Sequence, residues 1–315
     1  MRASIPFESG PVALQLDEAE LSWIAQESDA LLRLNGIRFL RGEPFEYFYR
    51  LARLNDAMTL PIVAPSRRRD AVFLKILYAI WNITVDDELD RVGTSAGLDA
   101  SLAFLMATPA ERATLEGGAC AVLRRIAEVA PCCCLSRSEP VGFDLWEVAH
   151  GFCYEFLINR NPAQATHFEY RRYSAMTASI KIMLDFDCLC AARPLDVSEY
   201  RILRRAYDEL SSAIKLASDV GTLRREVYEE NNMSYLRILA EERTDSGESP
   251  KNAVMTGALR FREEVVQMAW GHLGIARELS AAIRGIDLSG VLGAVAGIVE
   301  IYASGVDPFF ESISP

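Results

Sequence analysis

Three aspartates near residue 88 are the first side chains in this sequence whose types and spacing could do chemistry. Residues 86–90 read Asp-Asp-Glu-Leu-Asp and follow a strongly apolar stretch. On a helix, Asp90 lies one turn after Asp86 and Asp87, so the three carboxylates can point to roughly one side. Like charges at this spacing repel each other, and a hard divalent cation such as Mg²⁺ would offset the repulsion. The pattern indicates a metal site at the mouth of a cavity, although a solvated helix end can look the same.

A second row of oxygen donors lies near residue 222. Ser218, Thr222 and Glu226 are spaced four residues apart, so they form one stripe on a helix. Hydroxyl and carboxylate oxygens in such a stripe can bind a hard cation. Similar stripes also occur on ordinary exposed helix faces. The stripe therefore indicates a metal site only in combination with the first motif.

Taken together, the two motifs resemble those of class I terpene synthases. The aspartate-rich motif of that family has the form DDxxD, which Asp86, Asp87 and Asp90 match. Its second metal motif has the form (N/D)Dxx(S/T)xxxE, which the segment from Ser218 to Glu226 resembles. The order of the motifs and their wide separation are also similar. The resemblance covers the chain from about residue 65 to about residue 245.

Two arginines extend the resemblance. Bacterial members of the family often carry a basic residue just before the glutamate of the second motif, and Arg225 occupies that position. They also carry an arginine that senses the diphosphate about 46 residues before the second motif, and Arg172 lies at that distance from Ser218. The resemblance implies that both guanidinium groups donate hydrogen bonds to diphosphate oxygens, for which their geometry is well suited.

The resemblance further implies a Mg²⁺-dependent lyase that ionises a prenyl diphosphate and guides the carbocation to a cyclic terpene. Three Mg²⁺ ions would join the protein to the diphosphate, two at the first motif and one at the second. The expected metal ligands are Asp86, Asp87, Asp90, Ser218, Thr222 and Glu226. A homodimer is also common in the family and is expected here.

An apolar cavity must fold the prenyl chain and exclude water. Aromatic faces in it can stabilise a passing cation by about 0.5–2 kcal/mol each. The candidates are Phe73, Trp81, Phe152, Phe156, Tyr173 and Trp270. Plain core packing remains the alternative for each of them. Asn82 precedes Asp86 by one turn and faces either the cavity or the surface.

Three departures from the family pattern bear on the substrate. Ser218 stands where the family usually has asparagine or aspartate, and Ala175 and Met176 stand where bacterial sesquiterpene synthases place aspartate and glycine. The tail from Glu300 to Pro308 lacks the Arg-Tyr pair of those enzymes. We therefore expect a C20 substrate, geranylgeranyl diphosphate or a copalyl-type diphosphate supplied by an upstream class II cyclase, with C15 farnesyl diphosphate as the alternative.

Two other functions compete with this interpretation. A trans-prenyltransferase shares the helical fold and the Mg²⁺-diphosphate chemistry, but it needs a second DDxxD motif. The segment from Asp185 to Asp187 does not supply one. A catalytically degenerate helical binding protein is the alternative outside enzymes, because Ser218, Ala175 and Met176 depart from the pattern.

The composition of the chain argues against a nucleic-acid-binding protein, a membrane protein and a zinc protein. The 315 residues carry a net charge of −11, which argues against a nucleic-acid partner. No run of about 18 apolar residues indicates a membrane span, and the first residues do not resemble a signal peptide. An odd count of seven cysteines favours reduced thiols and a cytoplasmic location, and the Cys132–Cys134 triplet lacks the paired spacing of a zinc site.

The elements that must position both motifs are helices. Long stretches without proline contain apolar residues at three- and four-residue spacing, and alternating strand patterns are missing. We predict an all-α fold, one class I terpenoid synthase-like helical bundle around an apolar cavity, with residues 1–315 forming a single domain. The expected helices cover residues 15–34, 44–57, 66–92, 98–107, 109–129, 140–159, 166–191, 196–242 with an interruption, 249–284 and 287–304.

Overall fold

The computed structural model describes residues 14–130, 135–136, 139–230, 232–243 and 251–306, and in this part of the chain the regular elements are helical. The only β-type pairing among these residues is an isolated bridge between Val63 and Ala191. The all-α prediction is therefore confirmed. The cysteine triplet Cys132–Cys134 and the tail beyond residue 306 lie outside the described residues.

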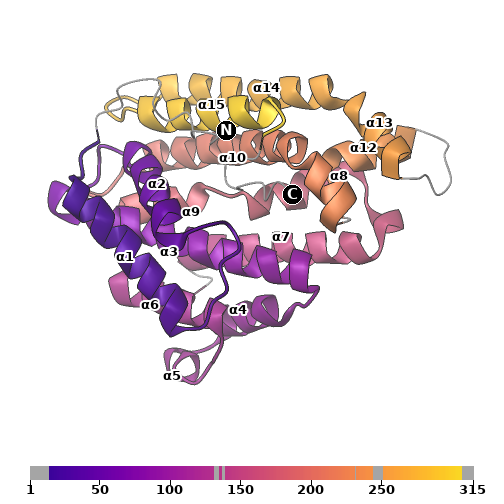
Figure 1. Cartoon of the computed structure of the whole chain (residues 1–315). Helices are drawn as coiled ribbons and strands as arrows, with labels where there is room; N and C mark the ends of the chain where they lie inside the picture. Colours follow the sequence, from indigo (N-terminus) through magenta and orange to yellow (C-terminus); the bar gives the residue numbers. More distant parts are fainter. Residues whose placement is uncertain (1–13, 131–134, 137–138, 231, 244–250, 307–315) are drawn as a thin grey trace.

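The helices run in an order close to the predicted one (Figure 1). They are α1 (Glu18–Leu34), α2 (Pro44–Ala57), α3 (Arg68–Asp87), α4 (Ala96–Met106), α5 (Pro109–Arg112), α6 (Gly118–Val129), α7 (Pro140–Arg160), α8 (His167–Thr177), α9 (Lys181–Leu189), α10 (Val197–Gly221), α11 (Leu223–Arg225), α12 (Tyr235–Arg243), α13 (Lys251–Leu259), α14 (Arg262–Ala281) and α15 (Ser289–Ala303). The shorter turns are η1 (Pro65–Arg67), η2 (Glu88–Val92), η3 (Pro162–Gln164) and η4 (Glu226–Glu230).

Local sequence signals explain where many of these helices begin. Proline occupies the first turn of α2, α5 and α7, where the missing N–H costs nothing. Capping boxes start α1, α5 and α10, each pairing an N-cap side chain with a glutamate three residues later. These signals fix helix starts but say little about interruptions further along.

Three predicted helices are divided in the structure. The range 109–129 contains α5 and α6, separated at Gly117, whose φ of 111° suits glycine. The range 166–191 is broken after Thr177, and the range 249–284 is broken at Arg260 and Phe261. The predictions of continuous helices there were wrong, because the apolar spacing continues across each break.

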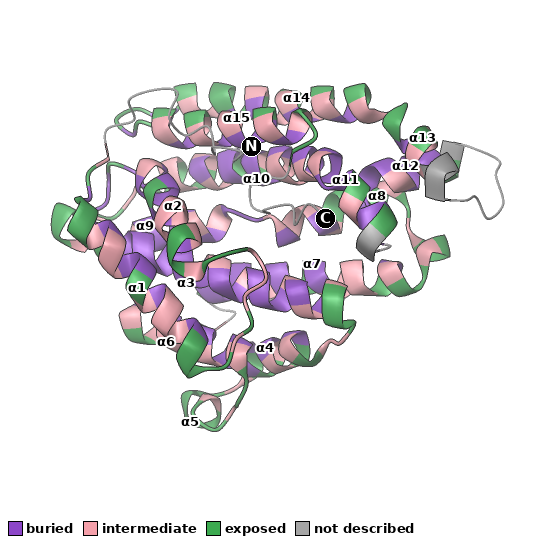
Figure 2. Cartoon of the chain, viewed as in Figure 1, coloured by how far each residue is buried: buried purple, intermediate pink, exposed green. Residues whose placement is uncertain are grey.

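The helices form layers around α3, α7 and α10 (Figure 1). Helix α10 packs against α14 and α15 on one side and against α8 and α9 on the other, while α7 packs against α4, α8 and α9. Helix α3 packs against α2, α6 and α9 and is buried around almost its whole circumference, as expected of a central helix. Figure 2 shows buried residues along α3, α7 and α10. Among the described residues, none of the helices is both long and apolar enough to cross a membrane.

Candidate active site

The first acidic motif lies where α3 ends. Asp86 and Asp87 close the α-helix, and Asp90 lies in η2, a single π-helical turn that stops at Gly93 with a φ of 72°. The Asp86 side chain keeps 33% of its exposure and the Asp87 side chain only 8%. Because a π-turn widens the helix, Asp90 is rotated relative to its position on a regular α-helix.

Arg41, in the segment between α1 and α2, binds both aspartates that end α3. Its Nη2 lies 2.9 Å from Asp86 Oδ2 and 3.3 Å from Asp87 Oδ1. Burial raises the pKa of Asp87, and the charge of Arg41 opposes that rise. Asp87 Oδ2 is nevertheless buried without a hydrogen-bond partner. A buried carboxylate oxygen left in this state is a suitable ligand for a cation.

The second motif lies at the end of α10. Helix α10 ends at Gly221, the short helix α11 follows, and Glu226 opens the π-helical turn η4. The Thr222 hydroxyl lies 2.6 Å from Glu226 Oε1 and 2.7 Å from the main-chain carbonyl oxygen of Ser218, so the side chains of Thr222 and Glu226 meet. Burial and the nearby Asp219 raise the pKa of Glu226 to about 8, and its Oε2 has no hydrogen-bond partner. These oxygens also suit a hard cation.

Asp219, the second residue of this motif, has a different role from its neighbours. Its side chain is fully buried, and its Oδ2 accepts a hydrogen bond of 3.0 Å from the backbone N–H of Tyr235, the first residue of α12. Its Oδ1 lies 3.3 Å from Nζ of Lys215. Asp219 therefore fixes α12 against α10, which makes it a structural member of the motif.

A buried ion pair lies between the two motifs. Nζ of Lys215, one turn before Ser218 on α10, lies 2.9 Å from Oε1 of Glu155 on α7. Burial raises the pKa of Glu155, Lys215 opposes that rise, and the charge of Asp86 adds to it. Glu155 thus interacts electrostatically with Asp86 of the first motif and forms an ion pair with Lys215 on α10, the helix that carries the start of the second motif.

Glu155 also holds the end of α8. The hydroxyl groups of Ser174 and Thr177 both donate to its Oε1, the second over 3.2 Å. Gly151, one turn earlier on α7, makes this approach possible, because a Cβ there would lie 2.8 Å from the carbonyl oxygen of Tyr173. Helix α8 can therefore pack closely enough for its hydroxyls to reach the carboxylate.

The break between α8 and α9 is held by α3. The hydroxyl of Tyr78 donates to the Ser179 carbonyl oxygen over 2.7 Å, and Nδ2 of Asn82 donates to the Thr177 carbonyl oxygen over 2.9 Å. These bonds satisfy carbonyl groups that the interrupted helix leaves without a partner. Asn82, which was expected to face the cavity or the surface, lies one turn before Asp86. Its side chain instead fixes the break between α8 and α9.

Both acidic motifs are therefore placed at helix ends joined through Glu155, Lys215 and the α8–α9 break. Within the described residues, however, no three His, Cys, Asp or Glu side chains lie close enough together to form a metal-binding group. In this structure the Arg41 guanidinium binds oxygens of Asp86 and Asp87. The expected ligands belong to two half-sites: the first consists of Asp86, Asp87 and Asp90, and the second of Ser218, Thr222 and Glu226.

Comparison with known proteins decides the fold. No protein-family model matches the chain, and no curated protein matches its sequence. Among solved structures, it is similar to 2-methylisoborneol synthase from Streptomyces coelicolor A3(2), crystallised with Mg²⁺ and geranyl-S-thiolodiphosphate, with a TM-score of 0.61, 12% identity and 92% of each chain covered. It is also similar to linalool/nerolidol synthase from Streptomyces clavuligerus, in complex with 2-fluorogeranyl diphosphate, with a TM-score of 0.53, 13% identity and coverage of 90% of this chain and 96% of that one.

The chain has the terpene synthase fold. This confirms the predicted architecture, since both similar structures align over at least nine-tenths of the chain. At 12–13% identity the likeness concerns the fold alone, so the roles of individual residues must be argued from their own surroundings.

Within this terpene synthase fold, the predicted aromatic residues separate into two groups. Trp81 and Phe152 are fully buried with ring centroids 6.4 Å apart, and Trp81 Nε1 donates to the Ser101 hydroxyl over 2.9 Å. Phe156 is half-buried with the Arg160 guanidinium 4.2 Å from its ring centroid. Trp270 is half-buried on α14, a helix that packs on α10. The structure therefore pairs Trp81 with Phe152 in the core and places Trp270 on a different layer.

The two predicted arginines also differ in their surroundings. Arg225 is half-buried on α11, and its charge lowers the pKa of Glu226 against the effect of burial. Arg172 is exposed, and its guanidinium lies 5.4 Å from the ring centroid of Tyr173. Among the described contacts, none joins Arg172 to either acidic motif. Its role as a diphosphate sensor stays a prediction.

Four residues of this site were not found from the sequence. Arg41, Gly151, Glu155 and Lys215 lie far apart along the chain and belong to no motif. The one available signal is a single charge within an apolar helix, as with Glu155 in residues 151–158 and Lys215 in residues 213–217. Charged residues are almost never fully buried unless paired, so such positions are worth testing for partners.

Proposed function

We propose that this chain is a Mg²⁺-dependent class I terpene synthase that ionises a prenyl diphosphate and releases diphosphate and a cyclic terpene. The observation that carries the proposal is the pair of oxygen-rich helix ends, at Asp86–Asp90 and Ser218–Glu226, joined by one buried charged junction inside this fold. 2-Methylisoborneol synthase, which has the same fold, binds Mg²⁺ and a geranyl diphosphate analogue.

The residues present fit Mg²⁺. Unpartnered carboxylate oxygens of Asp87 and Glu226 are buried beside the two half-sites, and Mg²⁺ prefers such ligands. Asp86, Asp87 and Asp90 would hold metal at the first motif, and Ser218, Thr222 and Glu226 at the second, with three ions in all. When bound, Mg²⁺ stabilises the negative charge that develops on the departing diphosphate.

The protein itself contributes position and charge. Arg225 lies beside Glu226 and would donate to diphosphate oxygens, as Arg172 would from α8. The Glu155–Lys215 pair keeps the α8 end, α7 and α10 in a fixed arrangement, so that the two half-sites need little reorganisation. Trp81 and Phe152, which pack on each other in the core, would help to exclude water from the carbocation side of the reaction.

The substrate is proposed to be C20, geranylgeranyl diphosphate or a bicyclic copalyl-type diphosphate made by a class II cyclase, in preference to C15. The support is the departure at Ala175 and Met176 from the bacterial sesquiterpene pattern. Both structural neighbours hold C10 geranyl-type analogues, so the substrate panel must include that length as well.

The test is incubation of the purified chain with geranyl, farnesyl, geranylgeranyl and copalyl diphosphates, with Mg²⁺ or with EDTA. Released diphosphate is assayed and products are identified by gas chromatography–mass spectrometry. We expect a cyclic product and diphosphate release that EDTA abolishes. Chain extension only when isopentenyl diphosphate is added would favour a prenyltransferase, and absence of release from every substrate would favour a binding protein.

A further inference from the structure

A largely buried arginine binds the first half-site in this structure. The Arg41 side chain keeps only 13% of its exposure, which is low for an arginine in a connection between helices. Its Nη2 lies 2.9 Å from Asp86 Oδ2 and 3.3 Å from Asp87 Oδ1, and Nε of Arg91 lies 3.4 Å from the same Asp87 oxygen. Positive charge of the chain itself thus compensates two carboxylates that are expected to bind metal.

Arg41 reaches this position from a connection with few backbone constraints. Residues 36–42, here called the Arg41 segment, join α1 to α2 and lie between two glycines with positive φ, 60° at Gly36 and 98° at Gly42. The backbone N–H groups of residues 38–40 donate to no backbone carbonyl group among the described residues. Phe39 instead anchors the segment by packing on aromatic rings of α2. Because glycine adopts either sign of φ, a rotation at Gly42 can move Arg41 without unfolding α1 or α2.

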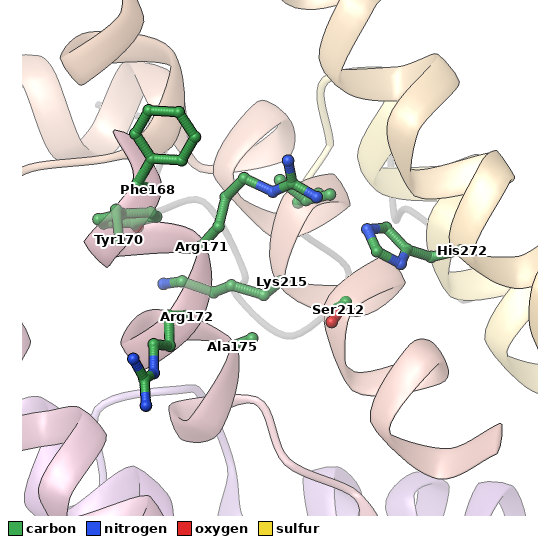
Figure 3. Close-up of a pocket in the computed structure, with 9 residues that line it drawn as sticks. Phe168, Tyr170, Arg171, Arg172, Ala175, Ser212, Lys215 and His272 are labelled. Atoms are coloured by element: carbon green, nitrogen blue, oxygen red, sulfur yellow. The ribbon is translucent and has the colours of Figure 1, made fainter. Parts of the chain in front are cut away.

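A lysine close to the second half-site is used differently. Nζ of Lys215 lies 2.9 Å from Glu155 Oε1 and 3.3 Å from Asp219 Oδ1. Figure 3 shows Lys215 extending from α10 toward Tyr170 on α8, and its Nζ lies 5.5 Å from the centroid of that ring. Among the described contacts, no hydrogen bond or ion pair joins Lys215 to Glu226. Lys215 therefore does not occupy the second half-site in the way that Arg41 occupies the first.

We propose that Arg41 is an internal counter-cation that keeps the metal affinity of the first half-site low until the Arg41 segment moves away. The inference rests on the proposed function, in which Asp86 and Asp87 are metal ligands. A divalent ion on these carboxylates would lie next to the guanidinium, and like charges repel strongly in a half-buried site. Metal and the present position of Arg41 are therefore alternatives, and by linkage each weakens the other to the same extent.

The test is a titration of the full chain with Mn²⁺ in the absence of substrate, with free Mn²⁺ measured by electron paramagnetic resonance. Carboxylates bind Mn²⁺ as they bind Mg²⁺. Arg41→Gln should bind Mn²⁺ about tenfold or more tightly than the unmodified chain, because it removes a positive charge beside two ligands. The same change in an Asp86→Ala background should give no gain, which assigns the effect to the first half-site.

Arg38→Gln is the matched control. Arg38 belongs to the same segment, but its side chain is exposed. The substitution makes the same change in net charge, and solvent screens an exposed charge, so Mn²⁺ affinity should stay within about twofold of that of the unmodified chain.

Hydrogen exchange tests the movement of the Arg41 segment. Saturating Mn²⁺ should speed the exchange of the backbone amides of this segment in the unmodified chain. Arg41→Gln should show the fast exchange already in EDTA, because its anchor on α3 is lost. The amides of α1 and α2 should keep their protection in both chains.

Three results would overturn the proposal: equal or weaker Mn²⁺ binding by Arg41→Gln, an equal gain in Arg38→Gln, or Mn²⁺ binding without faster exchange in the segment. None of these measurements uses turnover. If one of these results is found while the unmodified chain still releases diphosphate from a prenyl substrate, only the role of Arg41 is wrong. Absence of release from every substrate would refute the proposed function, whatever the titration shows.

Discussion

Glu155 Oε1 and Lys215 Nζ lie 2.9 Å apart between α7 and α10, with side chains that keep only 16% and 17% of their exposure. Removing one member of such a buried pair leaves the other charge without compensation, which typically costs about 3–5 kcal/mol. Lys215 would retain Asp219, and the Ser174 and Thr177 hydroxyls would lose a charged acceptor. The pair is therefore expected to matter for both stability and turnover.

Glu155→Gln is accordingly expected to lower the free energy of unfolding by about 3 kcal/mol in urea titrations. Combining it with Lys215→Met should cost less than the sum of the two single changes, because the double variant leaves no lone charge. Glu128→Gln, which removes a surface partner of Arg125, serves as the control and should cost under about 1 kcal/mol. Strictly additive losses at residues 155 and 215 would mean that the pair is not coupled.

The metal half-sites are tested by Asp86→Ala and Glu226→Ala. Each change should abolish Mg²⁺-dependent turnover without unfolding the chain, so the far-ultraviolet circular dichroism should stay close to that of the unmodified chain. The reason is that each removes an oxygen ligand from a different half-site. Turnover is measured as released diphosphate from the preferred prenyl substrate.

Glu88→Gln is the matched control for these two changes. Glu88 belongs to the same acidic segment, but its carboxylate accepts a hydrogen bond of 2.8 Å from the backbone N–H of Gly97 at the start of α4. Glutamine keeps the acceptor, so turnover should be retained. Full activity in Asp86→Ala or Glu226→Ala, or equal loss in Glu88→Gln, would refute the metal assignment.

Ser218→Asn tests the departure in the second motif. An amide oxygen is a stronger ligand than a serine hydroxyl, and Ser218 is half-buried one turn before Thr222, so asparagine should retain or raise activity. The Mg²⁺ concentration that gives half-maximal turnover should fall or stay the same. Ser212→Asn on the same helix controls for the bulk of the new side chain. Complete loss in Ser218→Asn would mean that this half-site is built from other ligands.

Much of the fold could be predicted because its signals are local. Pro44, Pro109 and Pro140 mark helix starts, and the capping box at Asp196 and Glu199 marks the start of α10. The first motif could also be placed at the end of an apolar helix, whereas the second was expected only as a stripe along the helix predicted for residues 196–242. Both end in π-helical turns, which no spacing pattern reveals, since a π-turn depends on how the widened backbone is packed.

The remaining features depend on contacts between distant segments. The break after Thr177 has no proline or glycine to announce it, and it is fixed by Tyr78 and Asn82 from α3. Glu155 and Lys215 are 60 residues apart, and either one alone resembles a charge on an exposed helix face. Their pairing is set by how closely α7 approaches α8, which Gly151 permits.

The last prediction concerns pH and a second buried cluster, in which Arg204 lies between two carboxylates. Arg204 Nη2 is 2.6 Å from Asp144 Oδ1, and its Nη1 is 3.3 Å from Asp185 Oδ1. Burial and the charge of Asp144 raise the pKa of Asp185 to about 7, since one guanidinium does not neutralise two carboxylates. The Asp185-Phe186-Asp187 segment is thus used for core ion pairs, with Asp187 bound to Lys75 at 2.8 Å.

Because the pKa of Asp185 is higher in the folded chain than in the unfolded one, the folded state holds a proton that the unfolded state has released. The stability that this proton provides is present below about pH 4 and is lost as the pH rises toward 7. Asp185→Asn mimics the protonated form and should remove this part of the pH dependence. The free energy of unfolding, measured in urea at pH 5 and pH 8, should therefore fall more between these pH values in the unmodified chain than in Asp185→Asn. Equal falls would show that Asp185 is already ionised throughout this range.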